Sequence, residues 1–236
     1  MGKVSHQATE GYESPSENDI HHAVGAGESR RPTVAVLDDD EAILRSIGRA
    51  LAAQGFDARL FSSPALLLAE IASVAPSCLI ADLAMPGMTG LDVQRALAMQ
   101  GLKCPVIFVT GHGDVRTSVQ AMRGGAVDFL TKPFELYELL DALERAISKS
   151  RHFREIDDRL ASVQRRVESL TPREREVFKQ VIDGLLNKQI AANLGISEKT
   201  VKVHRGRVMR KMSVRSVAQL VRAAGQVERL QNEPEQ

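Results

Sequence analysis

Four stretches decide the fold: TVAVLDDDE (33–41), CLIADLAMPGMTG (78–90), VIFVTGHGD (106–114) and VDFLTKPFE (127–135). In each stretch a short apolar run gives way to Asp, Thr or Lys. A continuous apolar run is typical of a strand that is buried on both faces, as in a parallel sheet. The sequence therefore predicts strands over 33–38, 78–81, 106–109 and 127–130, and a weaker strand over 57–61.

Helical apolar spacing follows each of these strands. The predicted helices cover 41–54, a segment beginning at Ser63-Pro64, 91–100, 114–123 and 135–149. Five strands alternating with five helices predict an α/β doubly wound (βα)5 domain, a parallel sheet covered on both faces. The carboxyl ends of its strands are where such a sheet places its site.

Polar side chains stand at four of the five predicted strand ends. Asp38 and Asp39 follow the first strand, Asp82 the third and Thr110 the fourth, and the fifth runs into Lys132. Carboxylates brought together repel one another unless a cation neutralises them. Oxygen ligands of this kind suit Mg²⁺, which also pairs with phosphate. The sequence therefore predicts a magnesium site at this edge.

These motifs, in this order, resemble the receiver domain of bacterial two-component response regulators, and TGHGDV and AVDFLTKPFE resemble its FixJ-like subgroup. The resemblance implies that Asp82 accepts a phosphoryl group and that Asp38, Asp39, Asp82 and the Ala84 carbonyl hold Mg²⁺. It also implies that Lys132 pairs with the phosphoryl oxygens, that Thr110 and Phe129 move in response, and that the Lys132–Pro133 bond is cis. His112 reads as a loop residue.

Composition excludes several other classes of protein. The chain has 236 residues, no Trp and only two Cys, so neither a disulfide framework nor an aromatic stacking surface is expected. No apolar run reaches the roughly 20 residues of a membrane span, and the N-terminus lacks the apolar core of a signal peptide. The expected location is the cytoplasm.

The net charge of +1 conceals a polarity along the chain. Residues 33–150 carry 10 Lys/Arg and 14 Asp/Glu, whereas residues 171–236 carry 13 and 7. A basic C-terminal part predicts an anionic partner such as nucleic acid. Between the two parts, apolar residues from Phe153 to Leu170 recur at alternating steps of three and four. This stripe predicts a helical linker, which either pairs as a coiled coil or packs on its own domain.

Short helices around LGIS (194–197) predict a helix-turn-helix motif in the basic part. Its second helix, over 198–212, opposes an apolar face to a basic one, as a major-groove helix requires. Residues 165–229 resemble the LuxR/NarL-type DNA-binding domain. The resemblance implies groove or phosphate contacts by Asn187, Lys188, Lys199, Lys202, Val203, Arg205 and Arg207. Gly206 departs from relatives with a long side chain there.

A last helix is predicted over 214–224, capped by Ser213, with Val217, Leu220, Val221 and Ala224 as a dimerisation surface. The expected organisation is a disordered extension (1–32), a receiver domain (33–150), a helical linker (151–164), a LuxR-type domain (165–229) and a disordered tail (230–236).

Together these features predict a DNA-binding transcriptional regulator, an activator rather than an enzyme, that a sensor histidine kinase phosphorylates on Asp82. The expected partners are that kinase, double-stranded promoter DNA, a second copy when phosphorylated and RNA polymerase, with no membrane. The FixJ-like resemblance also suggests a role in rhizobial nodulation. Two alternatives stay open: a phosphorylation-independent pseudo-receiver regulator, and a Mg²⁺-dependent phosphohydrolase with Asp82 as nucleophile.

Overall fold

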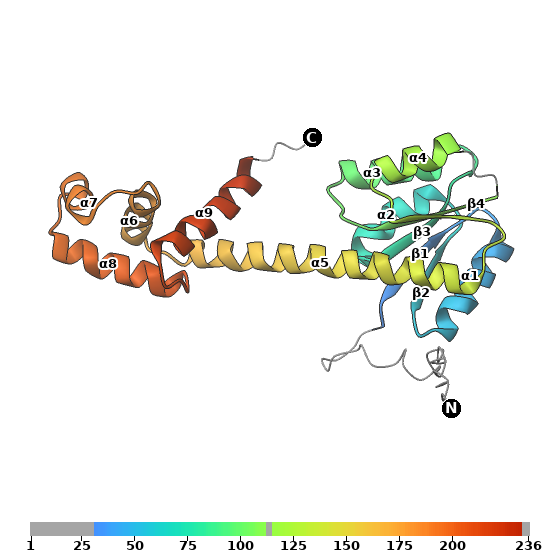
Figure 1. Cartoon of the computed structure of the whole chain (residues 1–236), viewed down its shortest axis with the longest axis horizontal. Helices are drawn as coiled ribbons and strands as arrows, with labels where there is room; N and C mark the ends of the chain where they lie inside the picture. Colours follow the sequence, from blue (N-terminus) through green and yellow to red (C-terminus); the bar gives the residue numbers. More distant parts are fainter. Residues whose placement is uncertain (1–30, 112–114, 233–236) are drawn as a thin grey trace, which may run out of the picture. The chain divides into compact units, whose positions relative to one another are not determined.

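The computed structural model describes residues 31–111 and 115–232. His112 and all but the last two residues of the predicted N-terminal extension therefore lie outside the described residues. Five strands and four helices alternate from residue 33 onward, and a long fifth helix follows them (Figure 1). Their bounds are β1 (Thr33–Leu37), α1 (Glu41–Ala53), β2 (Asp57–Phe61), α2 (Pro64–Val74), β3 (Cys78–Asp82), α3 (Gly90–Met99), β4 (Val106–Thr110), α4 (Val115–Arg123), β5 (Asp128–Thr131) and α5 (Leu136–Glu168).

The strands form one parallel sheet in the order β2-β1-β3-β4-β5, which confirms the predicted doubly wound fold. Alternate residues of each strand enter opposite cores. Ala35 and Leu37 pack with α2, α3 and α4, whereas Val34 and Val36 pack with α1 and α5. Because both faces of the sheet are covered, the three central strands β1, β3 and β4 are almost continuously apolar, and their polar residues stand at or just after their ends.

Local sequence signals fix where the receiver helices begin. Asp40 accepts hydrogen bonds from the first backbone N–H groups of α1, and Ser63 caps α2, which has Pro at its first position. Thr89 and Asp92 form a reciprocal capping box on α3. These caps place the helices directly after the strand ends, so the connecting loops at that edge are short.

Helix α5 runs without a break from Leu136 to Glu168 and so includes the predicted linker. Its first part is buried against the sheet through Leu139, Leu143 and Ala146. Towards its end, Val163 and Val167 pack against the C-terminal core. The end of the predicted stripe therefore packs on its own domain, whereas Ile156, between these two parts, stays exposed.

Four more helices form the C-terminal part: α6 (Pro172–Ile182), α7 (Asn187–Leu194), α8 (Glu198–Lys211) and α9 (Val217–Asn232). Thr171 and Glu174 form the predicted capping box on α6. Gly195 ends α7 in the left-handed conformation, and Ser197 caps α8. The two short helices around LGIS are therefore present as the sequence predicts.

The last helix differs from the prediction at both ends. Ser213 does not cap it, because Ser213 adopts a positive φ of 53° and lies in the turn after α8. Ser216 takes this role, and its hydroxyl accepts the Gln219 N–H at 3.2 Å. The helix also continues to Asn232, beyond the predicted domain end at residue 229 and into the segment expected to be a disordered tail.

The predicted dimerisation surface on this helix is also corrected. Leu220 and Ala224 are 0% and 5% exposed, and Val217 is packed against the same core. These side chains complete the protomer's own hydrophobic core against α5 and α6, since so small a domain has few other apolar groups with which to fill it. Of the four residues, only Val221 is exposed, at 43%.

Candidate metal centre and nucleic-acid interface

Sheet register brings the predicted acidic residues together. Leu37 pairs with Ala81 across β1 and β3, so the next residues, Asp38 and Asp82, lie side by side at the sheet edge. Ligand oxygens from Asp38, Asp39 and Asp82 all lie within 4.8 Å of one another. This spacing would allow three carboxylates to bind one cation.

Lys132 closes the cluster from the end of β5. Its backbone N–H donates to the Thr110 carbonyl at 2.7 Å, which fixes the start of the loop against β4. Its ammonium donates to Asp38 Oδ2 at 2.6 Å and lies 3.4 Å from Asp82 Oδ1. The following Lys132–Pro133 bond is cis, as the resemblance implied.

The three carboxylates are not equivalent. Asp38 and Asp82 are buried, whereas Asp39 is exposed. Burial raises the pKa of Asp82, Lys132 opposes this rise, and the neighbouring Asp38 adds to it. Asp82 Oδ1 also accepts the Leu83 N–H at 2.9 Å. Asp82 is thus a buried carboxylate at the sheet edge whose charge is partly neutralised by Lys132.

The residues present suit a hard divalent cation. Three carboxylates beside one ammonium leave an excess of two negative charges in a small volume. An oxygen-only donor set is the set that Mg²⁺ prefers, and it commonly keeps water on its open positions. Ala84, whose carbonyl was the fourth expected ligand, follows Asp82 by two residues and is exposed.

The other two predicted receiver residues lie on the neighbouring strands β4 and β5. Thr110 is buried at the end of β4, opposite Thr131 of β5. Phe129 is half-buried and packs against the core on the α2–α4 side of the sheet. Register therefore places Thr110 at the same edge as the acidic cluster, whereas Phe129 pairs with Phe108, two residues before that edge.

Sequence reasoning did not single out Gly90. It begins α3, and its N–H donates to the Leu83 carbonyl at 3.1 Å. A Cβ at this position would lie 2.5 Å from the Asp82 carbonyl and 2.9 Å from the Phe108 ring. Only glycine allows α3 to approach the Asp82 backbone this closely. The motif MPGMTG hints at a tight turn, but not at this contact.

Helix α8 carries the expected two-faced pattern. Val201 and Val208 are fully buried against α6 and α7, while Val203 is 48% exposed. The exposed polar members of the predicted interface are Lys188, Lys199, Lys202 and Arg207. A basic helix face that includes one apolar side chain can contact phosphates and also the methyl group of thymine in the major groove. Gly206 is exposed, and a methyl group added there would meet no atom within 4 Å.

Two predicted phosphate contacts touch each other. Arg205 Nη1 on α8 donates to Asn187 Oδ1 at the start of α7, at 2.9 Å. Both residues are half-buried. The pair ties the two helices of the motif together, so each residue has a structural role in addition to the contact that we expect.

A buried ion pair braces the same domain and was not predicted. Lys211 Nζ lies 2.7 Å from Glu174 Oε2, and Glu174 is only 2% exposed. The hydrogen bond from Lys211 is the main cause that lowers the pKa of Glu174 to about 2, helped by the Thr171 N–H. The sequence predicted Glu174 as part of a capping box. Its ion-pair partner Lys211 lies 37 residues away, and no sequence motif indicates this pairing.

Within residues 31–111 and 115–232, no helix is long and apolar enough to cross a membrane. Two family models match the chain. Residues 34–144 match the response regulator receiver domain, and residues 168–224 match the luxR family of bacterial regulatory proteins.

Similar proteins cover most of the chain. Nodulation protein W of Bradyrhizobium diazoefficiens is 44% identical over 82% of this chain and 86% of its own length. The transcriptional regulatory protein FixJ of Rhizobium meliloti is 41% identical over 81% and 94%. The solved structure of the response regulator StyR is 38% identical, with a TM-score of 0.70 over 83% of this chain and 99% of its own. The matches extend across both parts of the chain.

Proposed function

The chain belongs to the FixJ-like response regulators, which join a receiver domain to a luxR-family DNA-binding domain, and we propose that phosphorylation of its Asp82 controls its binding to promoter DNA. Proteins of this family are transcriptional regulators and not metabolic enzymes.

The observation that carries the proposal is the position of Asp82. Its carboxylate stands at the end of β3, within reach of Lys132 and of two further carboxylates. In our proposal, an Asp82 oxygen attacks the phosphorus of a phosphohistidine on a sensor kinase. A P–O bond forms, the P–N bond breaks, and the leaving histidine nitrogen takes up a proton from water. The product is an acyl phosphate on Asp82.

Charge at this edge favours the transfer. Asp38, Asp39 and Asp82, with the Ala84 carbonyl, would hold Mg²⁺, which when bound neutralises charge on the transferring phosphoryl group. Lys132 would turn its ammonium towards a phosphoryl oxygen, because it lies between Asp38 and Asp82 and is 19% exposed. The Thr110 hydroxyl would donate to another phosphoryl oxygen, and Phe129 would turn inward behind it.

The resulting switch is a population shift. A phosphorylated receiver makes contacts at Thr110 that the unphosphorylated one lacks, and this difference favours one of two receiver states. We propose that the favoured state dimerises and that paired helix-turn-helix motifs then bind a two-fold promoter site. Lys199, Lys202, Val203 and Arg207 would enter the groove, and Asn187, Lys188 and Arg205 would contact phosphates.

The remaining assignments follow from this role. We propose a cytoplasmic protein that activates transcription with RNA polymerase. The domain boundaries we propose are 33–150 for the receiver, 151–164 for a helical linker and 165–232 for the DNA-binding part, whose end moves from the predicted 229 because α9 runs to Asn232. The 44% sequence identity to nodulation protein W supports a role in nodulation. Restored nodulation in a strain lacking that protein, on expression of this chain, would test this role.

Acetyl phosphate, a small phosphoryl donor, tests the acceptor directly. Wild-type protein incubated with acetyl phosphate and Mg²⁺ should gain the mass of one phosphoryl group, removable by hydroxylamine. Asp82→Asn should gain none. The Thr110→Ala variant should still be phosphorylated but should not dimerise afterwards. Thr131 is the exposed residue that pairs with Thr110 on the adjacent strand, and Thr131→Ala should behave as wild type. Equal labelling of Asp82→Asn would contradict the proposal.

A further inference from the structure

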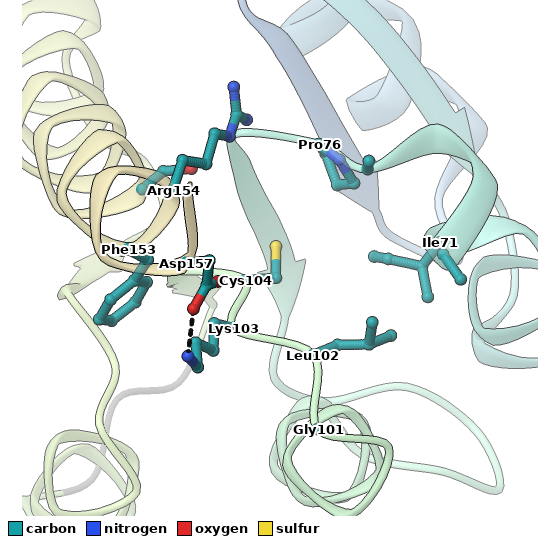
Figure 2. A pocket seen from close by; sticks show the side chains of 12 residues that line it. Ile71, Pro76, Gly101, Leu102, Lys103, Cys104, Phe153, Arg154 and Asp157 are labelled. Atoms are coloured by element: carbon teal, nitrogen blue, oxygen red, sulfur yellow. Dashed lines mark hydrogen bonds and ion pairs between the residues drawn. The ribbon is translucent and has the colours of Figure 1, made fainter. Parts of the chain in front are cut away.

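A cavity lies at the opposite end of the sheet from Asp82, away from the acidic cluster. It measures ≈ 340 Å³ and lies between the end of α2, the start of β3, the loop before β4 and the middle of α5 (Figure 2). None of the predicted receiver or DNA-binding residues lines it. Its volume falls within the range of about 300–1,000 Å³ that is usual for small-molecule sites.

The cavity walls are mainly apolar. Ile71, Pro76 and Leu102 form one side, and the Phe153 ring lies on the α5 side (Figure 2). Ser150, at its α5 wall, is buried. Such a surface favours an apolar molecular body over water, because each apolar group removed from solvent adds to the binding free energy.

The charges around the rim do not balance. Lys103 Nζ pairs with Asp157 at 2.8 Å, so these two groups neutralise each other. Arg154 has no carboxylate partner among the described residues. One of its guanidinium nitrogens donates to the neutral Ser77 hydroxyl at 2.9 Å. The rim therefore carries one net positive charge, held by a group suited to bidentate recognition of carboxylates.

Arg154 lines the cavity from α5, and its guanidinium lies at the rim, on the side of the loop that carries Pro76 (Figure 2). The Cys104 thiol lines the cavity wall, and burial raises its pKa to about 12, while Arg154 acts in the opposite direction. The thiol is therefore protonated and offers an anion no competing charge. Ser77, which holds the guanidinium in place, is 6% exposed.

We propose that this cavity binds a small carboxylate with a compact apolar body. The carboxylate would pair with Arg154, and the body would lie against Leu102, Ile71 and Phe153. The bound molecule would touch the receiver and the linker half of α5 together, since the two walls come from Leu102 and Phe153. This site is independent of the phosphorylation chemistry at Asp82.

Cyclohexanecarboxylate is a suitable probe, with cyclohexanecarboxamide as its neutral isostere. Each would be titrated into the ¹⁵N-labelled full-length chain while backbone amide shifts are followed. The carboxylate should cause saturable shifts in residues 101–104 and 150–157. The neutral amide should bind about tenfold more weakly or worse, as expected for loss of one charge-assisted contact.

Two variants of α5 separate a specific site from general anion binding. Arg154→Gln keeps a donor for Ser77 but removes the charge, and it should weaken carboxylate binding by about tenfold or more. Arg151→Gln removes the same charge from an exposed residue on the same helix that does not line the cavity, and it should bind as wild type. The unliganded spectra show whether each variant is folded.

The proposal is overturned if no saturable shifts occur at these residues up to the solubility limit of the probe. It is equally overturned if Arg154→Gln, Arg151→Gln and wild type bind the carboxylate with the same affinity. Phosphoryl labelling of Asp82 should proceed in all three proteins, so failure of this proposal is distinguishable from failure of the phosphorylation proposal.

Discussion

The Lys132 ammonium lies closer to Asp38 than to Asp82, at 2.6 Å and 3.4 Å. In the structure its main partner is therefore a neighbour of the proposed acceptor, and a small rotation would bring it to a group attached to Asp82. The buried Asp38 keeps the lysine at the site and, with Asp39, supplies negative charge for a cation. The charge of Lys132, the charges of the acidic residues and the charge of a bound cation therefore affect one another directly.

The exposed member of the acidic cluster should control cation affinity without affecting the fold. Asp39→Asn should weaken Mg²⁺ binding by on the order of tenfold or more, because it removes a carboxylate ligand. In metal sites generally, even the loss of a residue that only holds a ligand in place lowers metal affinity by about that factor. Titration calorimetry measures this directly. Asp57→Asn, at the start of β2 and so at the other end of the sheet, is the matched control and should bind Mg²⁺ as wild type. Equal losses in both variants would indicate a general charge effect.

Close packing at Gly90 should matter for the acceptor. In Gly90→Ala the new Cβ meets the Asp82 carbonyl and the Phe108 ring, so α3 or the Asp82 backbone has to move. We expect slower labelling by acetyl phosphate, with α/β secondary structure retained in circular dichroism. Gly111→Ala is the control, because a Cβ there meets no atom within 4 Å. Normal labelling of Gly90→Ala would show that this contact does not position the acceptor.

The basic face of α8 should give salt-dependent DNA binding. Lys202→Ala should lower affinity for duplex DNA and should reduce the slope of log affinity against log salt by about one, as for one lost phosphate contact. Electrophoretic or fluorescence titrations over a salt series measure both quantities. Lys179→Ala, which removes the same charge from α6, is the control. An unchanged slope for Lys202→Ala would remove Lys202 from the interface.

The Glu174–Lys211 pair should make stability depend on pH. The pKa of Glu174 is lowered to about 2 from an ordinary 4.5, so its contribution is complete above about pH 4.5 and is lost as pH falls towards 2. Glu174→Gln should cost about 1–3 kcal/mol at pH 7, because it breaks a buried charged contact. Urea unfolding followed by circular dichroism should show this difference shrinking below pH 4.5.

An exposed pair on the same helix provides the comparison. Glu176 pairs with Arg173 near the surface of α6, and Glu176→Gln should change stability by less than about 1 kcal/mol at any pH. A cost for Glu174→Gln that stays constant from pH 7 to pH 2 would show that its packing, and not its charge, stabilises the domain.

The sequence predicted which charged residues lie together at the sheet edge, because parallel strands end at the same edge. The apolar runs located the strands, and parallel register then brought Asp38 and Asp82 together without any side-chain information. By contrast, the contacts of Lys103 with Asp157 and of Arg154 with Ser77 join residues 54 and 77 positions apart. No periodicity or motif encodes such pairs, so the cavity lined by Lys103 and Arg154 could not have been predicted.

The last helix shows a different limit. The sequence predicted Ser213 as its cap, but Ser216 caps it, because Ser213 takes a positive φ in the turn after α8. Likewise, an apolar stripe through Leu220 and Ala224 fits either a dimer interface or the protomer's own core. The structure assigns these two residues to the core. Periodicity identifies a buried face but not what buries it.

The most direct test of phosphorylation-controlled assembly is the light-scattering mass of the full chain in Mg²⁺, with and without beryllofluoride, a mimic of the acyl phosphate. We predict a monomer that becomes a dimer only when beryllofluoride is present and only when Asp82 is intact, so that Asp82→Asn stays monomeric in both conditions. A wild-type mass that does not change with the mimic, or an Asp82→Asn mass that changes as much as wild type, would contradict the central claim.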